Sequence, residues 1–142
     1  SITLNHFINV MGKVSQEDPL NFGYGQQIIH HLKRVANTAV RNHGTLAGNL
    51  MLKYQHHEFP SDVFILLEAL EAKVVIKSSI EVNIFSPSDW LKETMEKKVV
   101  LKVILPKVSS TSQKFFSYKF TPRRANAHAH VNVAIKLAIE NS

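Results

Sequence analysis

The sequence predicts an α+β fold in which helices pack on a mainly antiparallel sheet. Apolar residues recur at helical spacing over residues 26–39, which is typical of a helix with one buried face. Two short β-rich runs, 73–77 and 81–85, are separated by three residues, as in a hairpin. Residues 131–139 alternate strictly between branched apolar and other side chains, and this period of two indicates a strand despite helix-favouring Ala and Lys residues. The chain therefore combines helices with strands.

The first half of the chain is expected to be mainly helical. A short amphipathic helix opens it over residues 4–11, and a turn at 21–25 precedes the long amphipathic helix described above. Residues 41–49 hold two Gly and two Asn, so we predict a loop there whose shape is set by its backbone. Ser61 is a suitable N-cap for a helix over 63–72, which is apolar nearly all round and is therefore expected to be buried.

The second half is expected to consist mainly of strands. After the hairpin, a polar segment at 86–88 introduces one or two helical turns over 89–95. A strand rich in β-branched residues follows at 99–105 and stops at a proline, and another strand at 115–120 comes after a linker rich in Ser and Thr. We place a domain boundary at this linker, after residue 108. The last strand ends close to the end of the chain, which suggests a piece of a larger protein.

Length and composition predict a folded domain without disulfides or thiolate metal sites. A chain of 142 residues suits one core, or one core plus a fragment of a second, and 44% hydrophobic against 20% charged residues is ordinary for globular proteins. The chain has no Cys, which excludes a disulfide, a thiolate metal site or an iron–sulfur cluster within it. The sequence contains no apolar run long enough to cross a bilayer and no recognisable signal peptide. We therefore expect a cytoplasmic protein without a membrane partner.

The chain carries an excess of positive charge. It has 17 Lys and Arg against 11 Asp and Glu, a formal charge of +6 that could attract nucleic acid, anionic lipid or a phosphate-bearing cofactor. Basic pairs occur at Lys33-Arg34, Lys97-Lys98 and Arg123-Arg124, but no stripe of basic residues is interleaved with aromatic ones. A solvated surface is the favoured interpretation, and we expect no nucleic-acid partner.

The segment Gly44-Thr45-Leu46-Ala47-Gly48-Asn49 is the candidate ligand-binding loop. Small residues let backbone N–H groups approach a phosphate or a flavin edge, and Thr45 and Asn49 add side-chain hydrogen bonds. The segment matches neither the dinucleotide fingerprint nor the P-loop, so by spacing alone an ordinary turn is the favoured interpretation. The eight His form no recognised ligand set, and no Ser-His-Asp order or carboxylate pair stands out. We therefore expect no metal site and no catalytic residue in this chain.

Several motifs, taken in order, resemble one known family. They are the segment from Val40 to Met51, which reads Val-Arg-Asn-His-Gly-Thr-Leu-Ala-Gly-Asn-Leu-Met, then Ser61-Asp62 before a buried helix, the strand that stops at Pro106, the segment Phe115-Phe116-Ser117-Tyr118-Lys119, and Arg123-Arg124. In this order they resemble the flavin-binding part of molybdenum hydroxylases of the xanthine dehydrogenase and aldehyde oxidase type. The resemblance covers nearly the whole chain. Residues 122–132 look most like those of insect aldehyde oxidases.

The resemblance implies a fold and a set of cofactor-binding residues. Residues 1–108 would be the second subdomain of a PCMH-type FAD-binding domain, and residues 109–142 the first strands of the following CO-dehydrogenase-flavoprotein-like C-terminal domain. The loop at 45–49 would hydrogen-bond FAD through backbone amides and side chains, while Asp62 would contact FAD and the Lys119 cation would favour negative charge on the flavin. The implied set, with Val100 packed against the flavin, is Thr45, Leu46, Ala47, Gly48, Asn49, Met51, Asp62, Val100 and Lys119.

Three departures from the family pattern bear on this site. Val35 stands ten positions before Thr45, where the family places an aromatic residue against FAD. Four extra residues lengthen the segment between Asn49 and Asp62. The subdomain that holds the FAD pyrophosphate in the family is absent from this sequence, so we expect weak FAD binding, or none, by this chain alone.

The resemblance also implies the activity of a larger enzyme. An aldehyde or N-heterocycle would be hydroxylated at a molybdopterin cofactor, and electrons would pass through two 2Fe–2S clusters and FAD to oxygen or a nicotinamide. The partners of this chain would be FAD and the iron–sulfur and molybdenum domains of the same protein, in a homodimer. Two alternatives are a PCMH-type flavin oxidoreductase outside the molybdenum group and a non-catalytic basic binding module.

Overall fold

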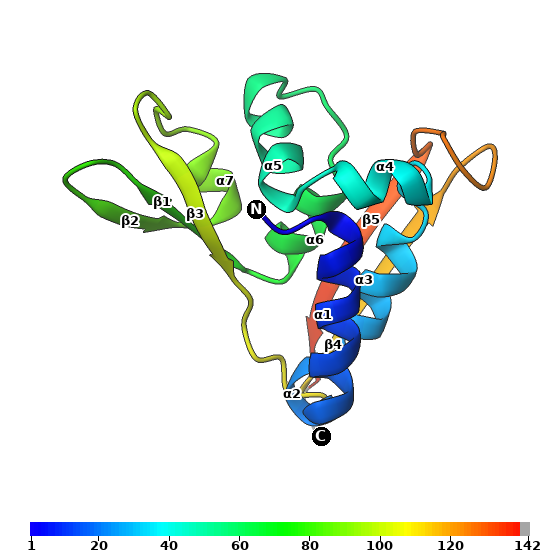
Figure 1. Ribbon diagram of the computed structural model, residues 1–142. Helices are drawn as coiled ribbons and strands as arrows, with labels where there is room; N and C mark the ends of the chain where they lie inside the picture. Colours follow the sequence, from blue (N-terminus) through cyan, green and yellow to red (C-terminus); the bar gives the residue numbers. More distant parts are fainter. Residues whose placement is uncertain (140–142) are drawn as a thin grey trace.

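The computed structural model describes residues 1–139, in which a three-stranded sheet stands beside a group of helices and a two-stranded sheet packs on α3 and α6 (Figure 1). This arrangement confirms the predicted α+β fold with antiparallel sheets. The helices are α1 (Leu4–Glu17), α2 (Pro19–Phe22), α3 (Gly25–Leu32), α4 (Thr38–His43), α5 (Leu46–Gln55), α6 (Asp62–Ala69) and α7 (Pro87–Trp90). The strands are β1 (Lys73–Lys77), β2 (Val82–Phe85), β3 (Val99–Ile104), β4 (Gln113–Phe120) and β5 (Val131–Ala138).

Polar side chains cap the starts of most helices. At the start of α1, the side chain of Thr3 accepts a hydrogen bond from the backbone N–H three residues further along the chain. The side chains of Asn37, Thr45 and Ser61 do the same for α4, α5 and α6. Each such bond satisfies an amide that has no partner within its helix, a contribution of about 1 kcal/mol. The predicted cap at Ser61 is confirmed, and the N-terminal helix runs further than expected, to Glu17.

The chain between residues 26 and 49 differs from the sequence prediction in two ways. The long helix predicted over 26–39 is wrong beyond Leu32, because the Arg41 guanidinium binds the carbonyl oxygens of Lys33 and Val35 at 3.1 and 2.7 Å. Those carbonyls are therefore satisfied without a further helical turn. The predicted loop at 41–49 is also wrong, since α4 continues to residue 43 and α5 begins at residue 46.

Both sheets are antiparallel throughout. In the first, β1 lies between β2 and β3, and its three central residues, Val74 to Ile76, are at most 1% exposed. The hairpin predicted from 73–85 is confirmed by the pairing of β1 with β2. In the second sheet, β4 pairs with β5 from Gln113 opposite Ala138 to Phe120 opposite Val131. The period of two in the last segment therefore identified a strand correctly.

One hydrophobic core joins the helices to both sheets. Leu32 of α3, Leu67 of α6, Val74 of β1 and Phe115 of β4 all belong to the same cluster of buried residues. Because β4 contributes to this core, the two-stranded sheet is packed on the helices. The domain boundary placed after residue 108 stays a prediction. Within residues 1–139, no helix combines the length and apolar character needed to span a membrane.

Candidate functional site

A cavity of about 500 Å³ opens where the starts of α5 and α6 meet the end of β4. Its wall contains Val35, residues 126–129 of the loop between β4 and β5, and five of the nine residues that the family resemblance implies. Those five are Thr45, Gly48, Asn49, Asp62 and Lys119. Small-molecule sites commonly occupy about 300–1,000 Å³, so this cavity has the size of a ligand pocket.

Thr45 shapes the start of α5 beside this cavity. Its hydroxyl accepts a hydrogen bond from the backbone N–H of Gly48 at 2.9 Å, and its carbonyl oxygen accepts one from the N–H of Asn49 at 3.0 Å. A Cβ at position 48 would stand 2.9 Å from that hydroxyl, so glycine there keeps the cap undistorted. The amides of Gly48 and Asn49 are thus engaged within the chain, and their predicted hydrogen bonds to FAD stay untested.

Asn49 also ties α5 to α6. Its Oδ1 accepts a hydrogen bond from Ser61 Oγ at 2.6 Å, and the same hydroxyl accepts the amide of Phe64 to cap α6. The Asn49 Nδ2 group has no acceptor among residues 1–139. An amide group held by one atom and free at the other is suited to donate a hydrogen bond to a ligand in the cavity.

A buried cluster of polar side chains forms one wall of the cavity. Asp62, at the first position of α6, accepts a hydrogen bond from Lys119 Nζ at 2.8 Å through Oδ2. Its Oδ1 accepts from His31 Nε2 and from Asn132 Nδ2, each at 3.1 Å. The side chains of Asp62, Lys119 and His31 are 12%, 3% and 1% exposed. Four elements, α3, α6, β4 and β5, therefore meet at one carboxylate.

This cluster sets the charge of Asp62. Burial opposes ionisation, but the hydrogen bonds from His31 and Lys119 and the positive charge of Lys119 outweigh it and hold the pKa of Asp62 below its ordinary value of 3.8. The carboxylate is therefore ionised at neutral pH. Because an ionised carboxylate only accepts hydrogen bonds, His31 must carry a proton on Nε2. Asp62 and Lys119 form a buried ion pair whose cation borders the cavity.

Two atoms of this cluster remain without partners. His31 Nδ1 and Asn132 Oδ1 are buried and make no hydrogen bond among the described residues. Buried polar atoms without a partner destabilise a fold by about 1–3 kcal/mol each and are rare, so two of them in one cluster require an explanation, of which a functional role is one. Within residues 1–139, no three His, Asp or Glu side chains come together as metal ligands would.

The other four implied residues do not line the cavity. Leu46 is buried in the core at 7% exposure, and Met51 packs against the same core. Ala47 is half-buried on α5. Val100 lies on β3, opposite Ile76 in the three-stranded sheet. Their contact with FAD stays a prediction.

Sequence reasoning missed His31 and Asn132. His31 of the helix predicted over 26–39 was given no role, yet only 1% of the residue is exposed. The available signal was its position three residues after Ile28, on the same helical face. Asn132 lies in the alternating segment, and its side of β5 faces the helices, where polar character is unexpected.

Comparisons with known proteins agree on one family. The sequence profile of the "FAD binding domain in molybdopterin dehydrogenase" matches residues 3–108. The chain is 28% identical over 143 residues to abscisic-aldehyde oxidase of Arabidopsis thaliana, a match that covers 94% of this chain and 10% of that protein. It is 30% identical over 126 residues to indole-3-acetaldehyde oxidase of the same plant, covering 80% of this chain and 9% of the relative. The chain thus spans about a tenth of these relatives, and the particular resemblance to insect enzymes stays a prediction.

Solved structures share the fold. Reconstituted CO dehydrogenase from Oligotropha carboxidovorans superposes with a TM-score of 0.74 at 15% identity, covering 97% of this chain and 45% of that chain. Quinoline 2-oxidoreductase from Pseudomonas putida 86 superposes with a TM-score of 0.61 at 24% identity, covering 80% of this chain and 37% of that chain. At such identities the likeness concerns the fold alone, and it extends beyond residue 108 to nearly the whole of this chain in the first case.

Proposed function

Because the chain belongs to the family of FAD-binding domains of molybdopterin dehydrogenases, we propose that the cavity between α5, α6 and β4 receives the flavin of FAD. The observation that supports this most is the buried Asp62–Lys119 pair, which holds a cation at the wall of the cavity. The rest of the wall is largely apolar, through Leu4, Val35, Val40, Leu52 and Phe59. An apolar pocket with a few fixed polar groups suits a flat aromatic ring with polar edges.

Each polar group at the cavity has a distinct role in this proposal. Lys119 places a positive charge where negative charge on the flavin would be favoured, and Asp62 fixes the position of that ammonium group. Asn49 offers its free Nδ2 group as a donor. Thr45 maintains the start of α5, which keeps Gly48 at the cavity wall. When bound, FAD would supply the electron-transfer chemistry, and these residues would bind and orient it.

We further propose that the complete protein is an oxidoreductase of the aldehyde oxidase and xanthine dehydrogenase type. Support comes from the relatives, which are aldehyde oxidases of which this chain spans about a tenth. Electrons would reach FAD from iron–sulfur clusters and leave to oxygen or a nicotinamide. The iron–sulfur and molybdenum domains would lie elsewhere in the same protein, and that protein would be a cytoplasmic homodimer.

Flavin fluorescence tests the proposed site. This chain alone should bind FAD weakly, so we expect FAD fluorescence to be quenched only at high concentrations of the chain, and Lys119→Met to weaken that affinity about tenfold or more, as loss of a charge-assisted contact does. Lys114→Met is the matched control, because Lys114 lies on the same strand and is exposed, with Nζ bonded to Ser110 O. Equal affinities for the two variants would contradict the assignment of Lys119 to the flavin site.

A further inference from the structure

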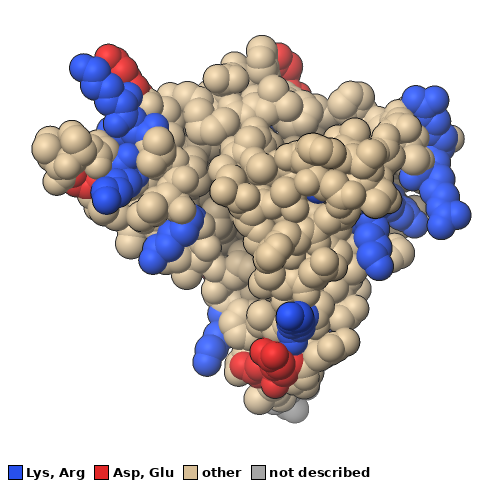
Figure 2. Space-filling view, in the orientation of Figure 1, with Lys and Arg blue, Asp and Glu red and all other residues tan. Residues whose placement is uncertain are grey.

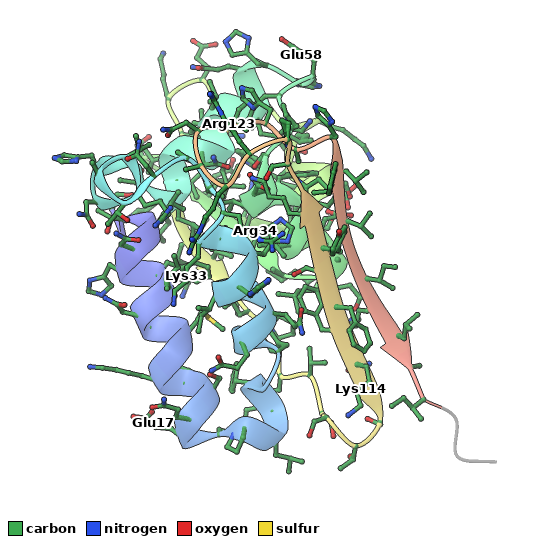
Figure 3. The ribbon with its side chains drawn as sticks, turned by 90° about the vertical axis from the view of Figure 1, so that its right-hand side faces the viewer. Glu17, Lys33, Arg34, Glu58, Lys114 and Arg123 are labelled. Carbon is green, nitrogen blue, oxygen red and sulfur yellow. The ribbon has the colours of Figure 1, made fainter. Side chains whose placement is uncertain are left out.

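Two basic pairs that are far apart in the sequence meet at one groove. Lys33-Arg34 follows the end of α3, and Arg123-Arg124 lies in the loop between β4 and β5. All four residues line a groove of about 1,260 Å³ between α1, α3, α4 and that loop. Figure 3 shows Lys33, Arg34 and Arg123 on the same side of the molecule, at the upper ends of the helices and strands. The two basic pairs, although far apart in the sequence, therefore belong to one groove.

The positive charge of this groove is not balanced by neighbouring acids. No Asp or Glu lines the groove, and none of the ion pairs within residues 1–139 involves these four residues. Two of the guanidinium groups are fixed by the backbone, since Arg34 donates to the carbonyl oxygen of Lys119 at 2.6 Å and Arg123 to that of Asn126 at 2.7 Å. Concentrated like charges with fixed positions create a potential that attracts an anion.

Aromatic rings lie beside these cations. Tyr118 and Phe120, on the outer face of β4, line the same groove and are 59% and 49% exposed. The amide side chains of Asn37 and Asn42 also line it. Arg and Lys bind phosphate, exposed aromatic rings stack on bases, and carboxamides form hydrogen bonds with base edges. This combination is the chemistry of nucleotide recognition.

The distribution of basic residues favours a small ligand over a nucleic-acid strand. On the face shown in Figure 2, Lys and Arg side chains form separate groups at the left, the right and the lower end of the molecule and not a continuous track. A strand would require cations along its length, whereas one nucleotide requires them at one end of a groove. The groove is also distinct from the flavin cavity: residues 123–125 of the β4–β5 loop face the groove, and residues 126–129 line the cavity.

We propose that this groove binds a nucleoside diphosphate, with the phosphates at Lys33, Arg34, Arg123 and Arg124 and the base against Tyr118 and Phe120. The site does not depend on the flavin proposal, because the two sets of lining residues share only Ala36 among residues 1–139. ADP, inorganic pyrophosphate and adenosine are the probes that separate the contributions of phosphate and base.

Amide chemical shifts and affinities of this chain with the three probes test the proposal. ADP is expected to move the amides around Lys33, Arg34, Tyr118 and Arg124 and to leave those of residues 45–49 unmoved. ADP should bind more tightly than pyrophosphate or adenosine, and more weakly as salt is raised. ADP shifts centred on residues 45–49, or equal affinities for ADP and pyrophosphate, would overturn the proposal.

Paired variants separate this site from general attraction to positive charge. Lys33→Gln with Arg124→Gln should weaken ADP binding about tenfold or more, because two charged contacts to phosphate are lost. Lys102→Gln with Lys107→Gln removes the same charge from exposed positions outside the groove and should change the affinity less than about twofold. Tyr118→Ser should weaken the binding of ADP about tenfold and leave the binding of pyrophosphate unaffected. Equal losses in the two double variants, or no effect of Tyr118→Ser on ADP, would refute a nucleotide site.

Discussion

Replacing Lys119 by Met removes the ammonium group that pairs with Asp62 and leaves the carboxylate buried. The Asp62 side chain is 12% exposed and that of Lys119 is 3% exposed, so little solvent can replace the lost partner. Breaking a buried ion pair on one side commonly lowers the free energy of unfolding by about 3–5 kcal/mol. The hydrogen bonds from His31 and Asn132 remain, and we therefore expect the lower end, about 3 kcal/mol.

Urea unfolding at pH 7, followed by the fluorescence of the fully buried Trp90, measures this loss. The double variant Lys119→Met with Asp62→Asn buries no charge and should recover at least about half of the stability that the single variant loses. Lys114→Met, on the exposed side of the same strand, should stay within about 0.5 kcal/mol of the wild type. A loss below about 1 kcal/mol for Lys119→Met is typical of a solvent-exposed pair and would refute the buried pair.

Three further predictions concern Asp62, Arg41 and Val35. The pKa of Asp62 is lower in the folded than in the unfolded chain, so the ionised carboxylate stabilises the fold fully above the ordinary value of 3.8, and this stabilisation is lost as pH falls through the folded pKa. The urea midpoint should therefore fall on acidification below about pH 4. It should fall less steeply in Asp62→Asn. Arg41→Met removes hydrogen bonds to two backbone carbonyls and two side chains from a residue that is 8% exposed, and should lower the free energy of unfolding by about 2–4 kcal/mol in the same urea assay. Val35→Tyr restores an aromatic ring at the cavity wall and should tighten FAD binding about two- to tenfold by fluorescence titration; an unchanged or weaker affinity would show that this position does not contact the flavin.

Local patterns predicted most elements of the fold, and the error at α3 arose from a side-chain contact that such patterns do not contain. The hairpin of β1 and β2 and the strand β5 follow from period-two patterns within the segments themselves. The end of α3 depends instead on Arg41, whose side chain folds back onto the carbonyls of residues 33 and 35. An apolar stripe carries no information about such a contact, so the predicted helix was too long.

The orientation of β5 shows a second limit of sequence patterns. Alternation identified the strand, but its branched apolar residues 131, 133, 135 and 137 are 37–51% exposed. Asn132, Ala134 and Lys136 occupy the side that faces the helices, where Asn132 binds Asp62. Alternation reveals the two faces of a strand but not which of them is buried in this chain.

The candidate site was predictable in part. Thr45, Asp62 and Lys119 were implied by the resemblance of their motifs, and the structure brings them to one cavity. His31 lies 31 positions from Asp62, and no short motif links the two. The groove likewise joins basic pairs from α3 and from the β4–β5 loop, which were interpreted separately as solvated surface. The packing of β4 against α3, and the hydrogen bonds of Asn126 to Ala36 and Asn37, bring these pairs together.

Riboflavin carries the ring system of FAD without its nucleotide half, and it tests the central claim most directly. We would titrate it into this chain and follow the amide chemical shifts, with ADP as the comparison ligand. The account predicts riboflavin-dependent shifts at residues 45–49, Asp62 and Lys119, while ADP leaves these amides unmoved. If FAD binds but riboflavin at comparable saturation moves none of these amides, the cavity is not the flavin site and the account is contradicted.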